Sequence, residues 1–262
     1  MTSQMNESFQ RIWWYPTGPL TFLPLHAAGL YGKGQPTGSE LSDFVVSSYV
    51  PTLTTLINGL TPGRPTKDQI LAVALPSESK LPGTLQEIKF IEKHTGPSSL
   101  VQLLNDKATV ESVSNGMHES SWMHFACHGV QDTNPTESAL LLTGHSKLTL
   151  SKIINLSLPH ANFAFLSACQ TATGDKNLEE ESVHLAAGML FAGYRGVVAT
   201  MWSIMDNDAP HFADEVYSHL LKGNHLNSSG AAEALHLAIK RLRDEGKPFI
   251  SWVPFIHIGV DL

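Results

Sequence analysis

The sequence has few cysteines, few basic residues and no long hydrophobic run. Only two of its 262 residues are cysteine and neither belongs to a CxxC pair, which rules out a disulfide framework and argues against a structural zinc site. No stretch approaches the roughly 20 uninterrupted apolar residues of a membrane span, and the N-terminus has no apolar signal core. Acidic residues outnumber basic ones, 24 to 17, which disfavours nucleic-acid binding. We therefore expect a soluble, cytoplasmic protein that binds neither nucleic acid nor membrane.

With 42% hydrophobic and 16% charged residues, the chain is too apolar to be disordered, and it is long enough to bury a sizeable core. Short continuous apolar runs, typical of strands covered on both faces, alternate with segments of helical period. This alternation predicts an α/β fold with a mostly parallel sheet and helices on both faces. The expected strands are Ile70–Leu75, Leu100–Leu104, Trp122–Cys127, Asn162–Cys169, Gly196–Trp202 and Phe255–Val260. The expected helices are Thr84–Thr95, a helix capped by Thr109 and running through Met117, Leu148–Ile154, Ser182–Tyr194, Asp208–Leu221 and Ala231–Glu245.

The first 65 residues differ from the rest because they are rich in Gly, Pro and Thr. Arg11–Thr17 and Leu20–Leu25 suggest two strands around a Thr17-Gly18-Pro19 turn, and Gly29–Gly38 suggests a loop. We expect residues 1–65 to form this strand pair and loops, and residues 66–262 to form the core.

Two of the expected strands end in residues that can carry chemistry. In a parallel sheet, ligands bind beyond the carboxyl ends of the strands. Trp122–Cys127 leads into His128 and Gly129, and the strand starting at Asn162 leads into Cys169. A thiolate with a nearby histidine can attack a carbonyl without a metal, and the N–H groups of Gly129 and Cys169 could form an oxyanion hole worth about 2.7–4 kcal/mol per donor.

Plainer interpretations of the same residues stay open. A lone cysteine at a strand end is more often a buried structural residue than a nucleophile. Cys127 competes with Cys169 for the role, but alternation along the strand points it away from the face of His128 and into the core. His124 shares the face of His128 but lies deeper, where a packing role is expected. From pattern alone, a Cys–His dyad and structural roles are equally supported.

Four motifs carry a resemblance to a known family: HFACHG (His124–Gly129), LSACQTATG (Leu166–Gly174), HLAAGMLFAGYRGVVATMWSIMD (His184–Asp206) and SWVPFIHIG (Ser251–Gly259). With them the chain resembles the CHAT family of caspase-like proteins, within the caspase, separase and gingipain group of cysteine peptidases. The resemblance implies a caspase-like three-layer α/β/α sandwich that includes residues 1–65. It also implies a cysteine endopeptidase with Cys169 as nucleophile and His128 as general base, acting on a protein or peptide substrate.

A thiolate and a histidine need no metal or third group for this chemistry, so we expect no cofactor. The 13 histidines form no metal-binding motif, so we expect no metal either. Family members often carry helical repeats upstream, so an upstream repeat domain or another activating protein is an expected partner.

Three more residues are candidates for a substrate pocket. Ser167 lies two residues before Cys169 and should share its face, although a locally satisfied strand hydroxyl is as good an explanation. Trp202 and Asp206 follow the Gly196–Trp202 strand, in a stretch similar to the separase segment that supplies an acidic pocket residue. The alternative for Asp206 is a helix cap, which is the role we expect for Asp208.

A polar segment after the nucleophile, Gly174–Glu181, is a candidate gate that a partner or an upstream domain would order, although its acids could equally form a solvated helix start.

Two other functions remain possible. One is a regulatory or scaffold module that kept the fold and lost turnover. The other is a non-peptidase hydrolase or transferase that uses the same thiol.

Overall fold

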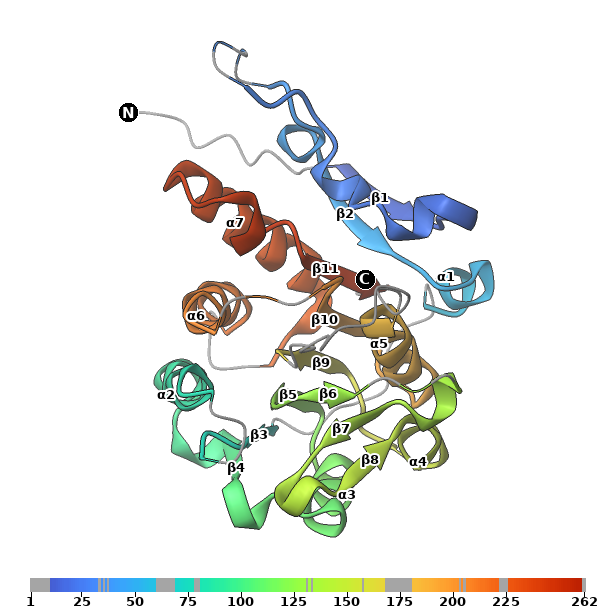
Figure 1. The fold of residues 1–262 in the computed structure, drawn as a ribbon, viewed down its shortest axis with the longest axis vertical. Coiled ribbons are helices and arrows are strands. Elements are labelled where there is room, and N and C mark those ends of the chain that lie inside the picture. Colours follow the sequence, from blue (N-terminus) through green and yellow to red (C-terminus); the bar gives the residue numbers. More distant parts are fainter. Residues whose placement is uncertain are drawn as a thin grey trace.

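A central sheet of eight strands organises the molecule (Figure 1). The computed structural model describes residues 10–32, 34, 36, 38–59, 69–77, 81–130, 132, 134–156, 158–167, 181–202, 204, 206–221 and 226–260. The strand order is β1-β2-β11-β10-β9-β5-β3-β4, and every pairing is parallel except that of β10 with β11. The strands are β1 (Gln10–Trp14), β2 (Val45–Tyr49), β3 (Ile70–Ala74), β4 (Leu100–Leu104), β5 (Trp122–Ala126), β9 (Phe163–Leu166), β10 (Gly196–Thr200) and β11 (Phe255–Gly259).

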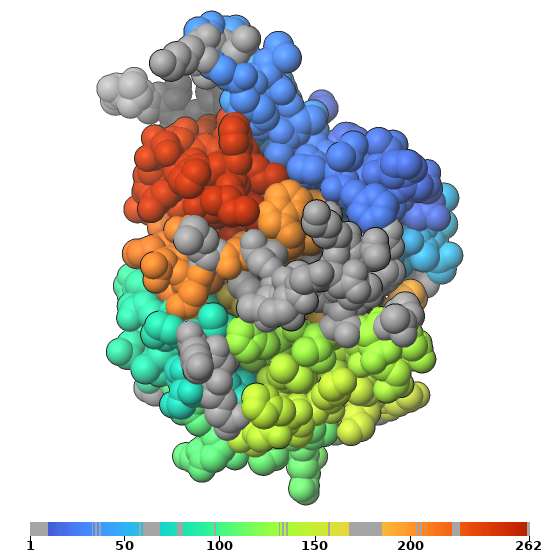
Figure 2. All heavy atoms as spheres, viewed as in Figure 1, coloured from blue at the N-terminus to red at the C-terminus, as the bar shows by residue number. Residues whose placement is uncertain are grey.

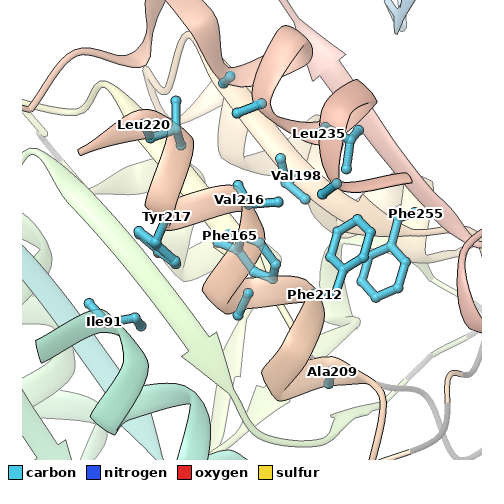
Figure 3. Packing of buried hydrophobic residues seen from close by; sticks show 14 of the residues in the cluster. Ile91, Phe165, Val198, Ala209, Phe212, Val216, Tyr217, Leu220, Leu235 and Phe255 are labelled. Atoms are coloured by element: carbon cyan, nitrogen blue, oxygen red, sulfur yellow. The ribbon is translucent and has the colours of Figure 1, made fainter. Parts of the chain in front are cut away.

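Helices cover both faces of this sheet, as the alternating pattern predicts. α2 (Gly83–Thr95), α6 (Ala209–Leu220) and α7 (Ala231–Asp244) pack on one face, around a cluster in which the rings of Phe212 and Phe255 stack 3.5 Å apart (Figure 3). α3 (Val110–Glu119), α4 (Leu150–Asn155) and α5 (Glu181–Phe191) cover the other face. The result is a three-layer α/β/α sandwich, and the expected fold class is confirmed.

The core strands and helices lie close to their expected positions. Each of the six predicted strands forms, and the side chain of Thr109 caps α3 by accepting the N–H of Ser112. The helix expected over Leu148–Ile154 begins two residues later, because Lys147–Thr149 forms a strand, β8, and α4 begins at Leu150. β8 belongs to a second sheet of three short strands, with β6 (Gly129–Val130) and β7 (Ala139–Leu141), which the sequence did not predict.

The N-terminal region differs from the expected strand pair. β1 ends at Trp14, and Gly18–Phe22 forms a 3-10 helix where the second strand was expected over Leu20–Leu25. The partner of β1 is instead β2, which is followed by α1 (Leu53–Gly59). Figures 1 and 2 show these blue residues beside α7 (red) at one end of the molecule. β1 and β2 thereby extend the main sheet beyond β11.

We expect Gly259→Ala to destabilise the protein by about 3 kcal/mol. Gly259 has a φ of +124°, and a Cβ there would lie 2.2 Å from the carbonyl oxygen of Arg195. Backbone strain and a clash with backbone therefore add together. Urea denaturation measures the loss.

Gly246→Ala is the matched control, because Gly246 has a φ of +71° but open space around its Cβ position. It should lose only about 1 kcal/mol, from backbone strain alone. Equal losses in the two variants would contradict the close approach at Gly259.

Candidate active site

The residues that the sequence analysis selected follow three adjacent strands of the main sheet. β5, β9 and β10 are neighbours and run parallel, so their carboxyl ends meet at one edge. His128 follows β5, Ser167 follows β9, and Trp202 and Asp206 follow β10. The fold therefore brings these four residues to the same edge, in the place where parallel sheets bind ligands.

His128 and Gly129 are held by the small second sheet. The carbonyl of His128 accepts the N–H of Leu141 on β7, with an N···O distance of 2.8 Å. In an antiparallel ladder, hydrogen-bonded and non-hydrogen-bonded pairs alternate, so the next pair, Gly129 with Leu140, is of the second kind. The N–H of Gly129 thus points away from β7.

The structure describes Cys127 but not Cys169. The side chain of Cys127 is fully buried in the core on the α3–α5 face, as expected from strand alternation. Cys169 and most of the candidate gate, 174–180, lie outside the described residues. Ser167, two residues before Cys169, is 3% exposed, and its Oγ has no hydrogen-bond partner within the described part of the chain. A buried hydroxyl without a hydrogen-bond partner is uncommon in folded proteins.

The acidic residues after β10 are both engaged. Asp206 Oδ2 accepts the N–H of Gly83, the first residue of α2, at 2.9 Å. Asp208 precedes α6 but does not cap it with its side chain, so the predicted cap is wrong. Its Oδ2 instead accepts the hydroxyl of Ser251 at 2.6 Å. Trp202 is partly buried and packs against the hydrophobic clusters of both faces.

α2 has a part near this site that no sequence pattern was used to predict. On α2, Glu87 is buried beside Ile88 and Ile91, whereas the apolar Leu85 is exposed. Glu87 hydrogen-bonds His124 of β5, which in turn contacts Tyr217 of α6. Burial and the charge of Glu87 together raise the pKa of Tyr217 well above its usual value. One signal was available, because Glu87 shares the helical stripe of Ile88 and Ile91.

The described residues contain no group of three or more His, Cys, Asp or Glu side chains arranged to hold a metal ion. No helix among them is long and apolar enough to cross a membrane.

Comparison with known proteins agrees with this fold. The family model of the CHAT domain matches residues 2–260. No curated protein matches the sequence.

Solved structures of gingipain and separase are among those similar to the chain. The Arg-specific cysteine proteinase gingipain R has a TM-score of 0.53 and 14% identity, over 83% of this chain and 54% of that one. The complex of the Porphyromonas gingivalis RgpB pro- and mature domains has a TM-score of 0.57 and 12% identity, over 99% and 66%. The Saccharomyces cerevisiae separase–securin complex has a TM-score of 0.58 and 19% identity, over 84% and 14%. The chain therefore spans about half of gingipain R and a small part of separase, and at these identities the likeness concerns the fold.

Proposed function

Because the chain belongs to the CHAT domain family and has a caspase-like fold, we propose that it is a cysteine endopeptidase with a dyad of His128 and Cys169. The observation that carries this proposal is the register of β5 and β9, in which Trp122 pairs with Phe163 and Phe125 with Leu166. Counted on by three residues past the ends of both strands, the same register would set His128 opposite Cys169. The two side chains would then face the same edge of the sheet.

The chemistry follows from these roles. His128 would take the thiol proton, and the Cys169 thiolate would attack the scissile carbonyl to form a thioester. The proton on His128 would pass to the leaving amine, and a water activated by the same histidine would release the acid. The N–H of Gly129 would stabilise the oxyanion of both tetrahedral intermediates, which is why its direction away from β7 supports the proposal. The dyad requires no metal or cofactor.

A preference for Arg or Lys before the scissile bond is the specificity that we propose. Asp206 supplies the negative charge, Ser167 a buried hydroxyl and Trp202 an apolar wall at the same edge. A carboxylate discriminates strongly in favour of a cationic side chain, through charge-assisted hydrogen bonds. Gingipain R, which has the same fold, is Arg-specific.

We expect Gly83→Ala to raise KM for an Arg peptide by about tenfold. A Cβ at Gly83 would lie 2.4 Å from the backbone oxygen of Asp206 and 2.8 Å from its Oδ1, so the acidic residue must shift. Asp206→Ala should have an effect of similar size. Both KM values are measured on Arg peptides and on matched peptides with an uncharged residue at that position.

Gly230→Ala is the control, since its Cβ position is open and it lies before α7. It should leave both KM values unchanged. A substrate profile dominated by Asp, or one that Asp206→Ala leaves unchanged, would contradict the proposed pocket.

We also propose that a partner or an upstream domain gates the site through the segment that follows Cys169. This segment carries Glu179, Glu180 and Glu181 in succession, which resist burial unless basic groups meet them. The similar structures include a peptidase with its pro-domain and separase with securin, so protein partners occur in both.

The competing function is a regulatory or scaffold module with little turnover. Cleavage profiling on a peptide library, with Cys169→Ala alongside, separates the two. Products that depend on Cys169 support the endopeptidase, and a profile identical in both proteins contradicts it. Product analysis would also reveal a non-peptidase hydrolase or transferase.

A further inference from the structure

A buried cluster of three polar side chains joins α2, β5 and α6. Glu87 is 1% exposed, and His124 and Tyr217 are fully buried. Nε2 of His124 lies 3.1 Å from Oε2 of Glu87, and Nδ1 lies 3.2 Å from the hydroxyl of Tyr217. Phe165 of β9 stacks on the ring of Tyr217, with centroids 5.8 Å apart (Figure 3). We name Glu87, His124 and Tyr217 the α2 cluster.

The hydrogen bonds of the α2 cluster are directional. An ionised carboxylate only accepts, so Nε2 of His124 carries the proton that binds Glu87. The tyrosine hydroxyl can either donate to Nδ1 or accept from it, so both ring nitrogens of His124 have a hydrogen-bond partner. Glu87, His124 and Tyr217 therefore keep their hydrogen bonds only while α2, β5 and α6 hold these positions relative to one another.

Stability alone does not account for this cluster. Hydrophobic residues of similar volume are often as good as a buried ion pair, or better, whereas a pair that has lost one partner is costly. Ile88 and Ile91 on α2 and Phe212 on α6 surround the cluster. His94 of α2 binds Asp214 of α6 at 2.6 Å, so among the described residues α2 has a separate polar tie to α6 but not to β5. The directional cluster thus fixes where α2 lies on β5, which apolar packing specifies less sharply.

The position of α2 matters because its first residue holds Asp206. Gly83 and Glu87 are four residues apart, which is about one helical turn, or roughly 6 Å. Gly83 donates its N–H to Asp206 and Glu87 binds His124 of β5, which lies four residues before His128 along the chain. One turn of α2 therefore connects the acidic residue after β10 to the strand that leads into the proposed base.

We infer that Glu87 is a positioning residue for substrate selectivity: through His124 and Tyr217 it holds α2 on β5, and so holds Asp206 at a fixed place relative to His128. The inference rests on the proposed role of Asp206. It assigns to Glu87 no contact with substrate. β5 itself is held by β3 and β9 on both sides, so a loss of the cluster moves α2 rather than His128.

Glu87→Leu is the variant that tests this, with two readouts. The preference for an Arg over an uncharged peptide, as a ratio of kcat/KM values, should fall about tenfold, while kcat/KM for the uncharged peptide changes less than about twofold. Hydrogen exchange of the Gly83 amide should become about tenfold faster, because its bond to Asp206 opens. Glu87→Gln keeps an acceptor at the same place, so its selectivity ratio and its Gly83 exchange rate should stay close to those of the wild type. Tyr217→Phe removes only the hydroxyl, and it gives the same readouts at smaller size if Glu87→Leu does not fold.

Ile91→Val is the matched control, since Ile91 is buried one turn further along α2 and outside the cluster. It should destabilise the protein without changing the selectivity or the exchange of Gly83. Unchanged selectivity and exchange in folded Glu87→Leu, or equal changes in Ile91→Val, would overturn the inference. A wild-type protein that cleaves no peptide would overturn the proposed function instead, and the exchange of Gly83 would still decide the role of Glu87.

Discussion

Cys169→Ala and His128→Ala should each lower kcat/KM for peptide hydrolysis by about 10⁴-fold or more. The reason is that a thiol nucleophile and its base act as a unit, so the loss of either leaves only binding and the oxyanion hole. His128 is only half-buried and lies between β5 and β6, so its substitution should leave the fold intact. Initial rates on the best peptide, with circular dichroism as the check of folding, measure both effects.

Cys127→Ala is the control within the same motif. Its sulfur is fully buried on the α3–α5 face, opposite the face of His124. We expect it to keep most of the activity and to lose only some stability. Equal loss of activity in Cys127→Ala and Cys169→Ala, with both folded, would contradict the assignment of the nucleophile.

Acid should destabilise the protein between about pH 6.5 and pH 4 through two buried histidines. Burial lowers the pKa of His26 to about 4, partly opposed by its hydrogen bond to the carbonyl of Val253. Burial, followed by the charges of Lys240 and Arg243, lowers the pKa of His236 to about 4. Both line one cavity between β2, α7 and β11.

The direction of the effect follows from linkage. The folded pKa lies below the unfolded value of 6.5, so the unfolded chain binds more protons in this window and stability falls as the pH drops. Each histidine contributes as much as about 3 kcal/mol, fully present above pH 6.5 and lost on approaching pH 4.

His26→Gln tests this prediction, because glutamine keeps hydrogen-bonding groups but does not titrate. Free energies of unfolding measured across the window should depend less on pH in His26→Gln than in the wild type. His118→Gln, at an exposed histidine, should follow the wild type. An unaltered slope in His26→Gln would show that His26 is not the group responsible.

The sequence predicted the core of the sheet better than its N-terminal edge. Runs such as Ile70–Leu75 are easy to recognise, because a strand that is buried on both faces is apolar at every position. Leu20–Leu25 is also apolar but forms 3-10 turns after Pro19, with Leu20 exposed. The strand that pairs with β1 contains Ser47 and Ser48, whose hydroxyls bind Trp14 and His257, so its composition looked mixed.

The candidate site divides in the same way. Strand alternation predicted that Cys127 faces the core, and the rule that ligands bind beyond the carboxyl ends of parallel strands drew attention to His128, Ser167, Trp202 and Asp206. The partner of Asp206 could not be predicted, because Gly83 lies 123 residues away and binds through its backbone. The N–H direction of Gly129 also depends on a short ladder, β6–β7, that no local pattern announces.

The most direct measurement of the central claim is covalent labelling by a peptide with a basic terminal residue and a thiol-reactive acyloxymethyl ketone. The reagent needs both a bound substrate mimic and an activated thiolate, and peptide mass spectrometry locates the adduct. We predict a single adduct on Cys169 in the wild-type protein, little adduct in His128→Ala, and unchanged labelling in Cys127→Ala. An adduct on Cys127, or equal labelling of Cys169 with and without His128, would contradict the dyad.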